Sequence, residues 1–319
     1  MHLSLNVKKG EGVELSKQYK IGIFYPVFIL INSDGDIITR WDSYYGAKRF
    51  INTLNRALSD MTTIKERLNR FRIKPSLYDA LFLAKYHADI YEHLQAVEYY
   101  RQAQMLNTNK MENYYFEIFS NTANAAWNEK ITFEDVLPVA DTAIKSNDNN
   151  PVKIVKIVRV ISNLSRKLFK TDQIEKYLRY GLDASANNPN PSMIKANNQL
   201  KIDFALYVRK DTAEAIKIKK ETLGPNWENN PDKFYSFSKW CLDRKVNLEE
   251  AERYVRRAES MAEPGEFKAG VLSVLADICY CRGKTDEAIK YINIVIAQDA
   301  DKDKYKQQLK KYQESKAKK

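Results

Sequence analysis

The chain has 319 residues, of which 44% are hydrophobic, and a formal net charge of +11. It is long enough for about two globular domains or one elongated array, and its apolar runs are far shorter than the ~20 residues of a membrane-spanning helix. The charge is spread out, because residues 1–56 carry eight Lys or Arg against five Asp or Glu and the remainder carries 44 against 36. Nucleic-acid binders gather basic residues on one face or beside stacking aromatic residues, so the sequence disfavours nucleic acid as a partner.

The start of the sequence does not read as a targeting segment. Met1-His2-Leu3 leads directly into strand-like sequence without the apolar stretch of a signal peptide. We therefore expect no export of the chain as written, and the compartment stays open.

The first 58 residues read as a mixture of short strands and helices. A glycine before the last helix and an Asp-Gly pair between two strands punctuate the segment. The expected elements are a strand Leu3–Val7, a helix Gly12–Tyr19, a turn Phe24–Phe28, a hairpin of Val27–Asn32 and Asp36–Arg40 closed by Ser33-Asp34-Gly35-Asp36, and a helix of about Ala47–Leu58 after Gly46.

In this order, residues 19–46 resemble the second half of a thioredoxin fold, and residues 9–15 are similar to the link that precedes it in that family. The resemblance implies a cis peptide bond before Pro26 and a substrate-binding role for the backbone of Tyr25. It also implies a thiol oxidoreductase, whose chemistry needs a Cys-x-x-Cys at a helix N-terminus, where the helix dipole lowers the pKa of the first thiol. The chain contains no such motif.

The thioredoxin fold places a central strand between Leu3–Val7 and Val27–Asn32, and the sequence has no counterpart of it. An isolated two-stranded hairpin is marginal in water, and its unpaired edge invites association. Val27–Ile31 is continuously apolar, which predicts burial on both faces. The N-terminal strand, a second copy of the chain or the first repeat helices could cover it.

From about residue 60 onward, apolar residues recur at helical spacing between short Asn- and Pro-rich breaks. Six segments align as the second helix of a helix–turn–helix unit. Their anchors step by 40, 38, 41, 36 and 37 residues: Ala96, Val136, Ile174, Ala215, Ala251 and Ala288. Small residues dominate seven positions after each anchor, as stacked helices require where backbones approach.

Two of these units resemble tetratricopeptide repeats. In the last unit, Leu272–Ala300, Leu275-Ala276 stands where the first helix of that repeat has its Leu-Gly/Ala pair, and Gly283 lies at the turn. The unit from Leu83-Ala84 to Ala103 is the next best match. We therefore predict a mainly α chain, with residues 1–58 as the C-terminal half of a thioredoxin-like domain and residues 59–319 as an α-solenoid of tetratricopeptide-like helix pairs.

Two basic stretches lie within the array. Residues 151–170 alternate cations with apolar residues, which is typical of a membrane-surface helix but also of a repeat helix. Because the array requires a helix here, we expect its apolar face to be buried in the solenoid. The tail from residue 302 to 319 carries eight lysines, which predicts a capping helix that frays into solvent.

The residues that could carry chemistry are few. Cys279 and Cys281 are two apart on an expected helix and project about 200° apart, so they cannot readily form a disulfide or share a metal. Cys279 falls on a core position, and His87 and His93 lack the spacing of ligands on one helix face. We found no nucleophile motif or phosphate-binding loop, and no cofactor or metal site.

The sequence therefore indicates a non-catalytic fragment or protein-binding module, with Tyr25 and Pro26 as the family's substrate-binding residues and a protein or peptide as the partner. The alternatives are a genuine repeat scaffold that recruits a partner, or a thiol–disulfide oxidoreductase in a full-length parent. For such a parent, the resemblance implies the bacterial periplasm or cell envelope. Self-association through the incomplete sheet is a further expectation.

Overall fold

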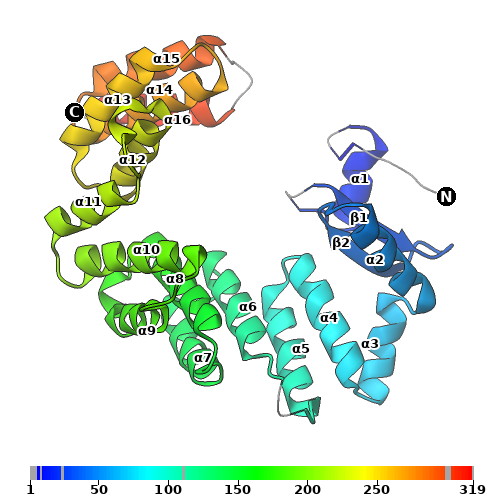
Figure 1. Ribbon diagram of the computed structural model, residues 1–319. Coiled ribbons are helices and arrows are strands. Elements are labelled where there is room, and N and C mark those ends of the chain that lie inside the picture. The colour runs from blue at the N-terminus through cyan, green and yellow to red at the C-terminus, as the bar shows by residue number, and fades with distance from the viewer. Residues whose placement is uncertain (1–5, 8, 23–24, 110–111, 299–302, 318–319) are drawn as a thin grey trace. The chain divides into compact units, whose positions relative to one another are not determined.

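The computed structural model describes residues 6–7, 9–22, 25–109, 112–298 and 303–317 (Figure 1). These ranges contain sixteen α-helices and one two-stranded sheet, and none of the helices is long and apolar enough to cross a bilayer. The chain divides into two compact units, Met1–Ala186 (unit 1) and Asn187–Lys319 (unit 2). This division follows compactness, whereas the boundary predicted at residues 58 and 59 follows a family resemblance and stays a prediction.

Six consecutive helix pairs make up most of both units, which confirms the predicted α-solenoid. Each pair consists of a first helix, a short turn and a second helix that packs against the first. Unit 1 holds α4 (Leu77–Asp89) with α5 (His93–Leu106), α6 (Tyr115–Trp127) with α7 (Phe133–Lys145), and α8 (Pro151–Lys167) with α9 (Glu175–Ser185). Unit 2 holds α10 (Pro191–Tyr207) with α11 (Thr212–Glu221), α12 (Pro231–Arg244) with α13 (Leu248–Met261), and α14 (Glu266–Cys281) with α15 (Thr285–Gln298).

The anchor residues predicted from the repeat are all at helix contacts. Each of the six has a relative exposure of 0%: Ala96, Val136, Ile174, Ala215, Ala251 and Ala288. The packing rule weakens in the fourth pair, because α11 ends at Glu221 and leaves Thr222 exposed beyond the helix. Four residues after its anchor, the same pair carries Lys219, which is half-buried. At this position the other five pairs carry Tyr, Ala, Leu, Val or Ile.

Three first helices begin with the same two residues. In α8, α10 and α12 an asparagine side chain accepts a hydrogen bond from a backbone N–H of the first turn, and a proline follows it. Proline suits this position because the N–H it lacks would have no partner inside the helix. The three starts lie forty residues apart, at Asn150-Pro151, Asn190-Pro191 and Asn230-Pro231.

Each of the six turns within a pair contains a residue in the left-handed conformation, and the turn from α12 to α13 contains a second one, Asn247 at φ 51°. Only the last of the six is the glycine that the sequence predicted, and the other five carry a side chain at φ between 54° and 62°. Such a backbone costs roughly 1–2 kcal/mol for a residue with a Cβ. The turn residues are Tyr91, Glu129, Phe169, Lys210, Lys245 and Gly283.

The N-terminal module comprises α1 (Glu11–Gln18), β1 (Val27–Ile31), β2 (Ile37–Asp42) and α2 (Ala47–Ser59). The two strands pair antiparallel, with Phe28 opposite Trp41, and the Tyr25–Pro26 peptide bond is cis. The predicted helices, hairpin and cis bond are thus confirmed to within one or two residues. The first three residues of the predicted strand Leu3–Val7 lie outside the described residues, and the rest of it is not a strand.

The hairpin is only partly covered on its two faces, and no described strand pairs with the outer edge of β1. Phe28 stacks on Trp41 at 5.5 Å, and Phe50 of α2 packs against both rings. On the other face Ile38 is buried, and α3 (Ile64–Ile73) and α4 contact β2. Among the described residues β1 pairs only with β2, so most of its apolar run is half-buried and Ile31 is 40% exposed. The predicted burial of this run on both faces is therefore wrong.

The module is docked on the turn of the first helix pair. Gly22 lies against the ring of Tyr91, where a Cβ would come within 2.4 Å of a ring carbon. Arg40 donates a hydrogen bond of 2.9 Å to the backbone carbonyl of Tyr19, and Lys20 forms an ion pair with Glu92. Glycine at position 22 thus permits the close approach.

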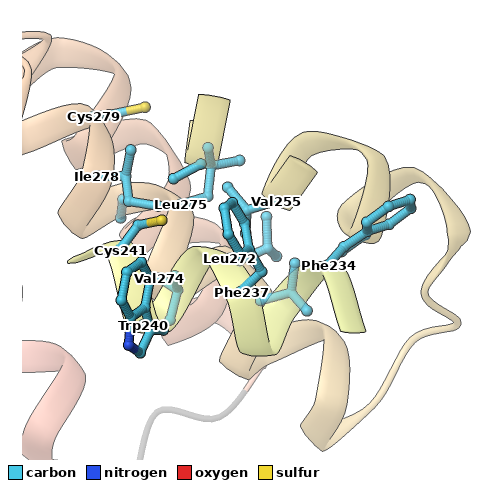
Figure 2. Close-up of a cluster of buried hydrophobic side chains, with 14 of the residues drawn as sticks. Phe234, Phe237, Trp240, Cys241, Val255, Leu272, Val274, Leu275, Ile278 and Cys279 are labelled. Carbon is cyan, nitrogen blue, oxygen red and sulfur yellow. The ribbon is translucent and has the colours of Figure 1, made fainter. Parts of the chain in front are cut away.

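Unit 2 is built around one apolar cluster to which every helix from α10 to α16 contributes. Figure 2 shows part of this cluster, with labelled residues of α12, α13 and α14. The last helix, α16 (Asp303–Ala317), places Tyr305 and Tyr312 in this cluster. The Tyr312 hydroxyl also donates a 2.7 Å hydrogen bond to Asp277 of α14. Residues 303–317 of the tail therefore form a capping helix, as predicted, and two buried tyrosines hold it to the cluster, whereas residues 302, 318 and 319 lie outside the described residues.

Candidate functional site

The family-derived site residues, Tyr25 and Pro26, lie just before β1. The Tyr25 side chain is 53% exposed, and the Pro26 carbonyl accepts a 2.9 Å hydrogen bond from the backbone N–H of Ser43. The turn is thus tied to the end of β2. Substrate binding at Tyr25 stays a prediction.

The cysteines do not form a thiol site. Cys241 and Cys279 are fully buried, whereas Cys281 is exposed, so the two cysteines of α14 point to opposite sides of the helix, as predicted. Burial raises the pKa of the Cys241 thiol to about 12 and that of Cys279 to about 11. A thiol with such a pKa is rarely a thiolate at neutral pH, so neither side chain is a ready nucleophile.

One group in unit 2 has the composition of a metal site. The ligand atoms of Glu252, Cys279 and Glu287 lie within 4.8 Å of one another. The guanidinium of Arg256 already binds this group, at 2.7 Å from Glu252, 2.5 Å from Glu287 and 3.9 Å from the Cys279 sulfur.

Arg282 and Lys284 complete the coordination of Glu252, whose side chain is only 5% exposed. Burial alone would raise the pKa of Glu252, but hydrogen bonds from Lys284, Arg256 and Arg282 outweigh it and lower the pKa to about 2. Three cations thus stand where a metal ion would, and the cluster ties α13 to α14 and α15.

The two histidines of the first pair serve structural contacts. His87 Nδ1 lies 2.7 Å from Glu92, and the His87 ring stacks on Tyr99. His93 is buried with Nδ1 at 3.0 Å from the Asn121 side chain of α6. They have different partners, which agrees with their spacing in the sequence.

The most distinctive exposed surface of unit 1 is formed by α6 and α8, which pack side by side. We call it the α6–α8 face. At one end the ammonium of Lys153 lies 5.9 Å from the ring centre of Phe116, and at the other end that of Lys167 lies 4.8 Å from the ring of Trp127. Lys167 also donates a hydrogen bond to the backbone carbonyl of Trp127. Because the N-terminal ends of α6 and α8 contact each other, and so do their C-terminal ends, the two helices run parallel.

Polar and cationic side chains fill the face between these ends. On α6, Ser120 is half-buried and Asn124 is exposed, in a row with the two rings. On α8, Lys156 and Arg159 are exposed on successive turns. Spacings of three, four and seven residues put each row on one side of its helix.

Three of the four cations of this face lack acidic partners among the residues that the structure describes. Lys153, Lys156 and Arg159 form no ion pair with any residue that the structure describes, and α8 itself contains no Asp or Glu. Lys167 is the exception, at 3.9 Å from Glu129. The face can therefore neutralise an anionic ligand while its aromatic rings and amide groups contact uncharged parts.

The opposite side of α8 agrees with the prediction of burial in the solenoid. The apolar residues that could have faced a membrane have exposures of 8% or less: Ile154, Val155, Ile157, Val158, Ile161 and Leu164. The sequence thus showed the basic stretch but not its neighbours on α6. Their signal was the row Phe116, Ser120, Asn124 and Trp127, which has helical spacing but mixed chemistry.

Comparisons with known proteins give repeat architectures. No family model matches the chain, and no curated protein matches it. A tetratricopeptide repeat protein from Parabacteroides merdae superimposes with a TM-score of 0.49 and 13% identity, over 83% of this chain and 96% of that one. The TPR2AB-domain:pHSP90 complex of yeast Sti1 gives a TM-score of 0.28 and 13% identity, over 74% and 98%. These are likenesses of fold at most, and the pairing of helices in this chain follows from its own contacts.

Proposed function

We propose that this protein is a non-catalytic repeat scaffold that binds an acidic segment of a partner protein on the α6–α8 face. The observation that carries the proposal is the set of three neighbouring cations, Lys153, Lys156 and Arg159, without an acidic partner among the described residues. Elsewhere in the same unit, exposed cations such as Lys170 and Lys176 are paired with Glu134 and Asp141.

The chemistry of the face favours a protein over a nucleic acid. Bases stack on open aromatic faces, but here Lys153 and Lys167 lie over the rings of Phe116 and Trp127. Ser120 and Asn124 offer hydrogen bonds that suit an extended backbone, and clustered cations suit its acidic side chains. A solenoid positions such groups on rigid helices, which limits the entropy lost on binding.

The experiment measures fluorescence anisotropy of a labelled random copolymer of glutamate and tyrosine. We expect the triple variant K153E/K156E/R159E to bind at least tenfold more weakly than the unaltered protein. The matched control is K195E/K201E/K217E, which makes the same change in net charge at exposed lysines of α10 and α11.

The control triple should keep its affinity. Equal weakening by both triples would reduce the effect to overall charge and contradict the proposal. Tight binding of single-stranded DNA with the same dependence on the three α8 cations would instead identify a nucleic-acid surface. Circular dichroism of both triples checks that the helices are intact.

A second candidate rests on the order of elements in the N-terminal module. We infer that α1, the turn at Pro26, the β1–β2 hairpin, Gly46 and α2 form a thioredoxin-like half-domain that binds an extended protein substrate beside Tyr25.

This half-domain should not act as a thiol oxidoreductase. As described above, the thiols of Cys241 and Cys279 are buried and have raised pKa values. The protein should therefore not reduce insulin disulfides faster than a cysteine-free variant, and turnover that disappears in C279S or C281S would contradict this.

A further inference from the structure

A groove runs through unit 1 between α2 on one side and β2 with α4 on the other. It consists of an inner cavity of about 270 Å³ and an outer cavity of about 230 Å³. The two cavities are continuous, because Thr53, Arg56, Lys85 and Asp89 line both. This groove is separate from the α6–α8 face.

The groove carries more positive than negative charge. Arg67 is paired at 2.7 Å with Asp60, so these two lining residues balance each other. The remaining charged groups of the walls are four cations and two carboxylates, which leaves an excess of two positive charges: Arg40, Arg49, Arg56 and Lys85 against Asp42 and Asp89.

The two cations that line both cavities are available to a ligand. Arg56 reaches the groove from α2 and Lys85 from α4, so they approach it from opposite walls. Both are exposed, and neither forms an ion pair with a residue in the described part of the chain. Arg40, in contrast, is buried and already donates to the carbonyl of Tyr19.

Aromatic rings line the inner cavity along one side of α4. Tyr78, Phe82 and Tyr86 follow one another at four-residue intervals and so lie in one row. The guanidinium of Arg67 lies 3.9 Å from the ring centre of Phe82 and 5.3 Å from that of Tyr78. Tyr78 is 57% exposed, and its hydroxyl donates a hydrogen bond to Asp60. The groove therefore combines a row of aromatic side chains with a pair of cations.

We propose that this groove binds a phosphate monoester carried on an aromatic ring, with Arg56 and Lys85 on the phosphate and the α4 aromatic row on the ring. A phosphate monoester concentrates nearly two negative charges on one group, which matches the excess of two positive charges on the walls of the groove. A guanidinium can contact two of its oxygens at once, and an ammonium adds a point charge. The source is either a free aryl phosphate or a phosphotyrosine side chain of a protein, which present the same chemistry.

The test uses phenyl phosphate, inorganic phosphate and phenol as probes on the full chain. Binding is followed by calorimetry and by the indole N–H resonance of Trp41, which lines the outer cavity of the groove. We expect saturable binding of phenyl phosphate and at least tenfold weaker binding of inorganic phosphate and of phenol. Failure of phenyl phosphate to bind, or equal binding of all three probes, would overturn the proposal.

Variants locate the site. R56Q and K85M should each weaken phenyl phosphate binding at least tenfold, whereas the matched controls R72Q and K65M, at exposed positions of α3 outside the groove, should not. Both target residues are exposed, so their replacement leaves the fold intact. Unchanged affinity in R56Q and K85M would refute the assignment.

A phosphotyrosine peptide and its unphosphorylated form distinguish the two sources. Tighter binding of the phosphopeptide than of phenyl phosphate, with displacement of phenyl phosphate, identifies a protein ligand. Binding of phenyl phosphate without the phosphopeptide identifies a small molecule. Because K153E/K156E/R159E leaves the groove untouched, the two proposals can fail independently.

Discussion

The charged cluster around Glu252 in unit 2 and the α6–α8 face of unit 1 treat their charged side chains differently. In unit 2, Glu252 is almost fully buried and is bonded by three cations from α13 and from the end and turn of α14. In unit 1, Lys153, Lys156 and Arg159 stand on α8 with no acidic partner among the described residues. A charge that is desolvated must be paired, whereas one in water need not be. Paired charges therefore hold helices together, and unpaired ones are free to meet a partner.

The largest expected effect comes from breaking the paired cluster of unit 2. Glu252→Gln removes the carboxylate that pairs with Arg282 and Lys284, the only such partner among the described residues, and half of the pairing of Arg256. Because the cations stay in place, we expect a loss of about 3 kcal/mol in the free energy of unfolding. Chemical denaturation measures it, and Glu249→Gln at an exposed position of the same helix is the control.

The same cluster predicts a dependence on pH. The folded-state pKa of Glu252 is about 2, below its ordinary value of 4.5. A depressed pKa means that this stabilisation is fully present above pH 4.5 and is lost as the pH falls toward 2. The Glu252→Gln variant should lose less stability than the unaltered protein over this interval, and parallel pH profiles would contradict the pairing.

A smaller effect tests whether both units follow one packing rule. Ala288 of unit 2 and Ala96 of unit 1 occupy the same repeat position, and both are fully buried. Replacing either by leucine should overpack the contact between helices and cost about 1–3 kcal/mol. Ala297→Leu, at an exposed position of α15, is the control. An unchanged melting temperature for Ala288→Leu would refute the repeat alignment.

The smallest expected effect comes from a substitution that makes one turn of unit 1 resemble the turn of the last pair in unit 2. Phe169 has φ 58° with a side chain that is 87% exposed, whereas Gly283 occupies the equivalent turn without a Cβ. Phe169→Gly should therefore stabilise the protein by about 1 kcal/mol, because it relieves the left-handed strain and loses few contacts. The control Lys156→Gly, within α8, should destabilise by about as much. Loss of stability in both variants would show that the Phe169 ring matters.

The repeat positions and the elements of the N-terminal module could be predicted because local chemistry fixes them. The anchors were found from spacing alone, since a small or apolar residue is needed wherever two helices touch. Among the turn residues, only Gly283 was predicted from the sequence. Tyr91 and Phe169 carry no local signal for a left-handed backbone. Tertiary contacts, such as that of Tyr91 with Gly22, support such a turn instead.

The candidate surfaces were harder to predict. The basic character of residues 151–170 was visible in the sequence, but its pairing with Phe116 and Trp127 depends on which helices become neighbours. The groove depends on bringing together residues about 30 positions apart, such as Arg56 and Lys85, which line it from opposite walls. The missing neighbour of β1 was predicted from the sequence, but the continuous apolar run of the strand indicated burial on both faces and not the half-buried state that the structure shows.

The repeated Asn-Pro starts have a consequence for how this chain can be rearranged. Each begins one helix pair and lies forty residues from the next, so every interval between them contains one complete pair. Removing residues 191–230 would join Asn190 to Pro231 and recreate the same helix start at the junction. The forty-residue interval, rather than the single helix, is therefore the cassette that duplication, deletion or exchange can move without disturbing a helix end.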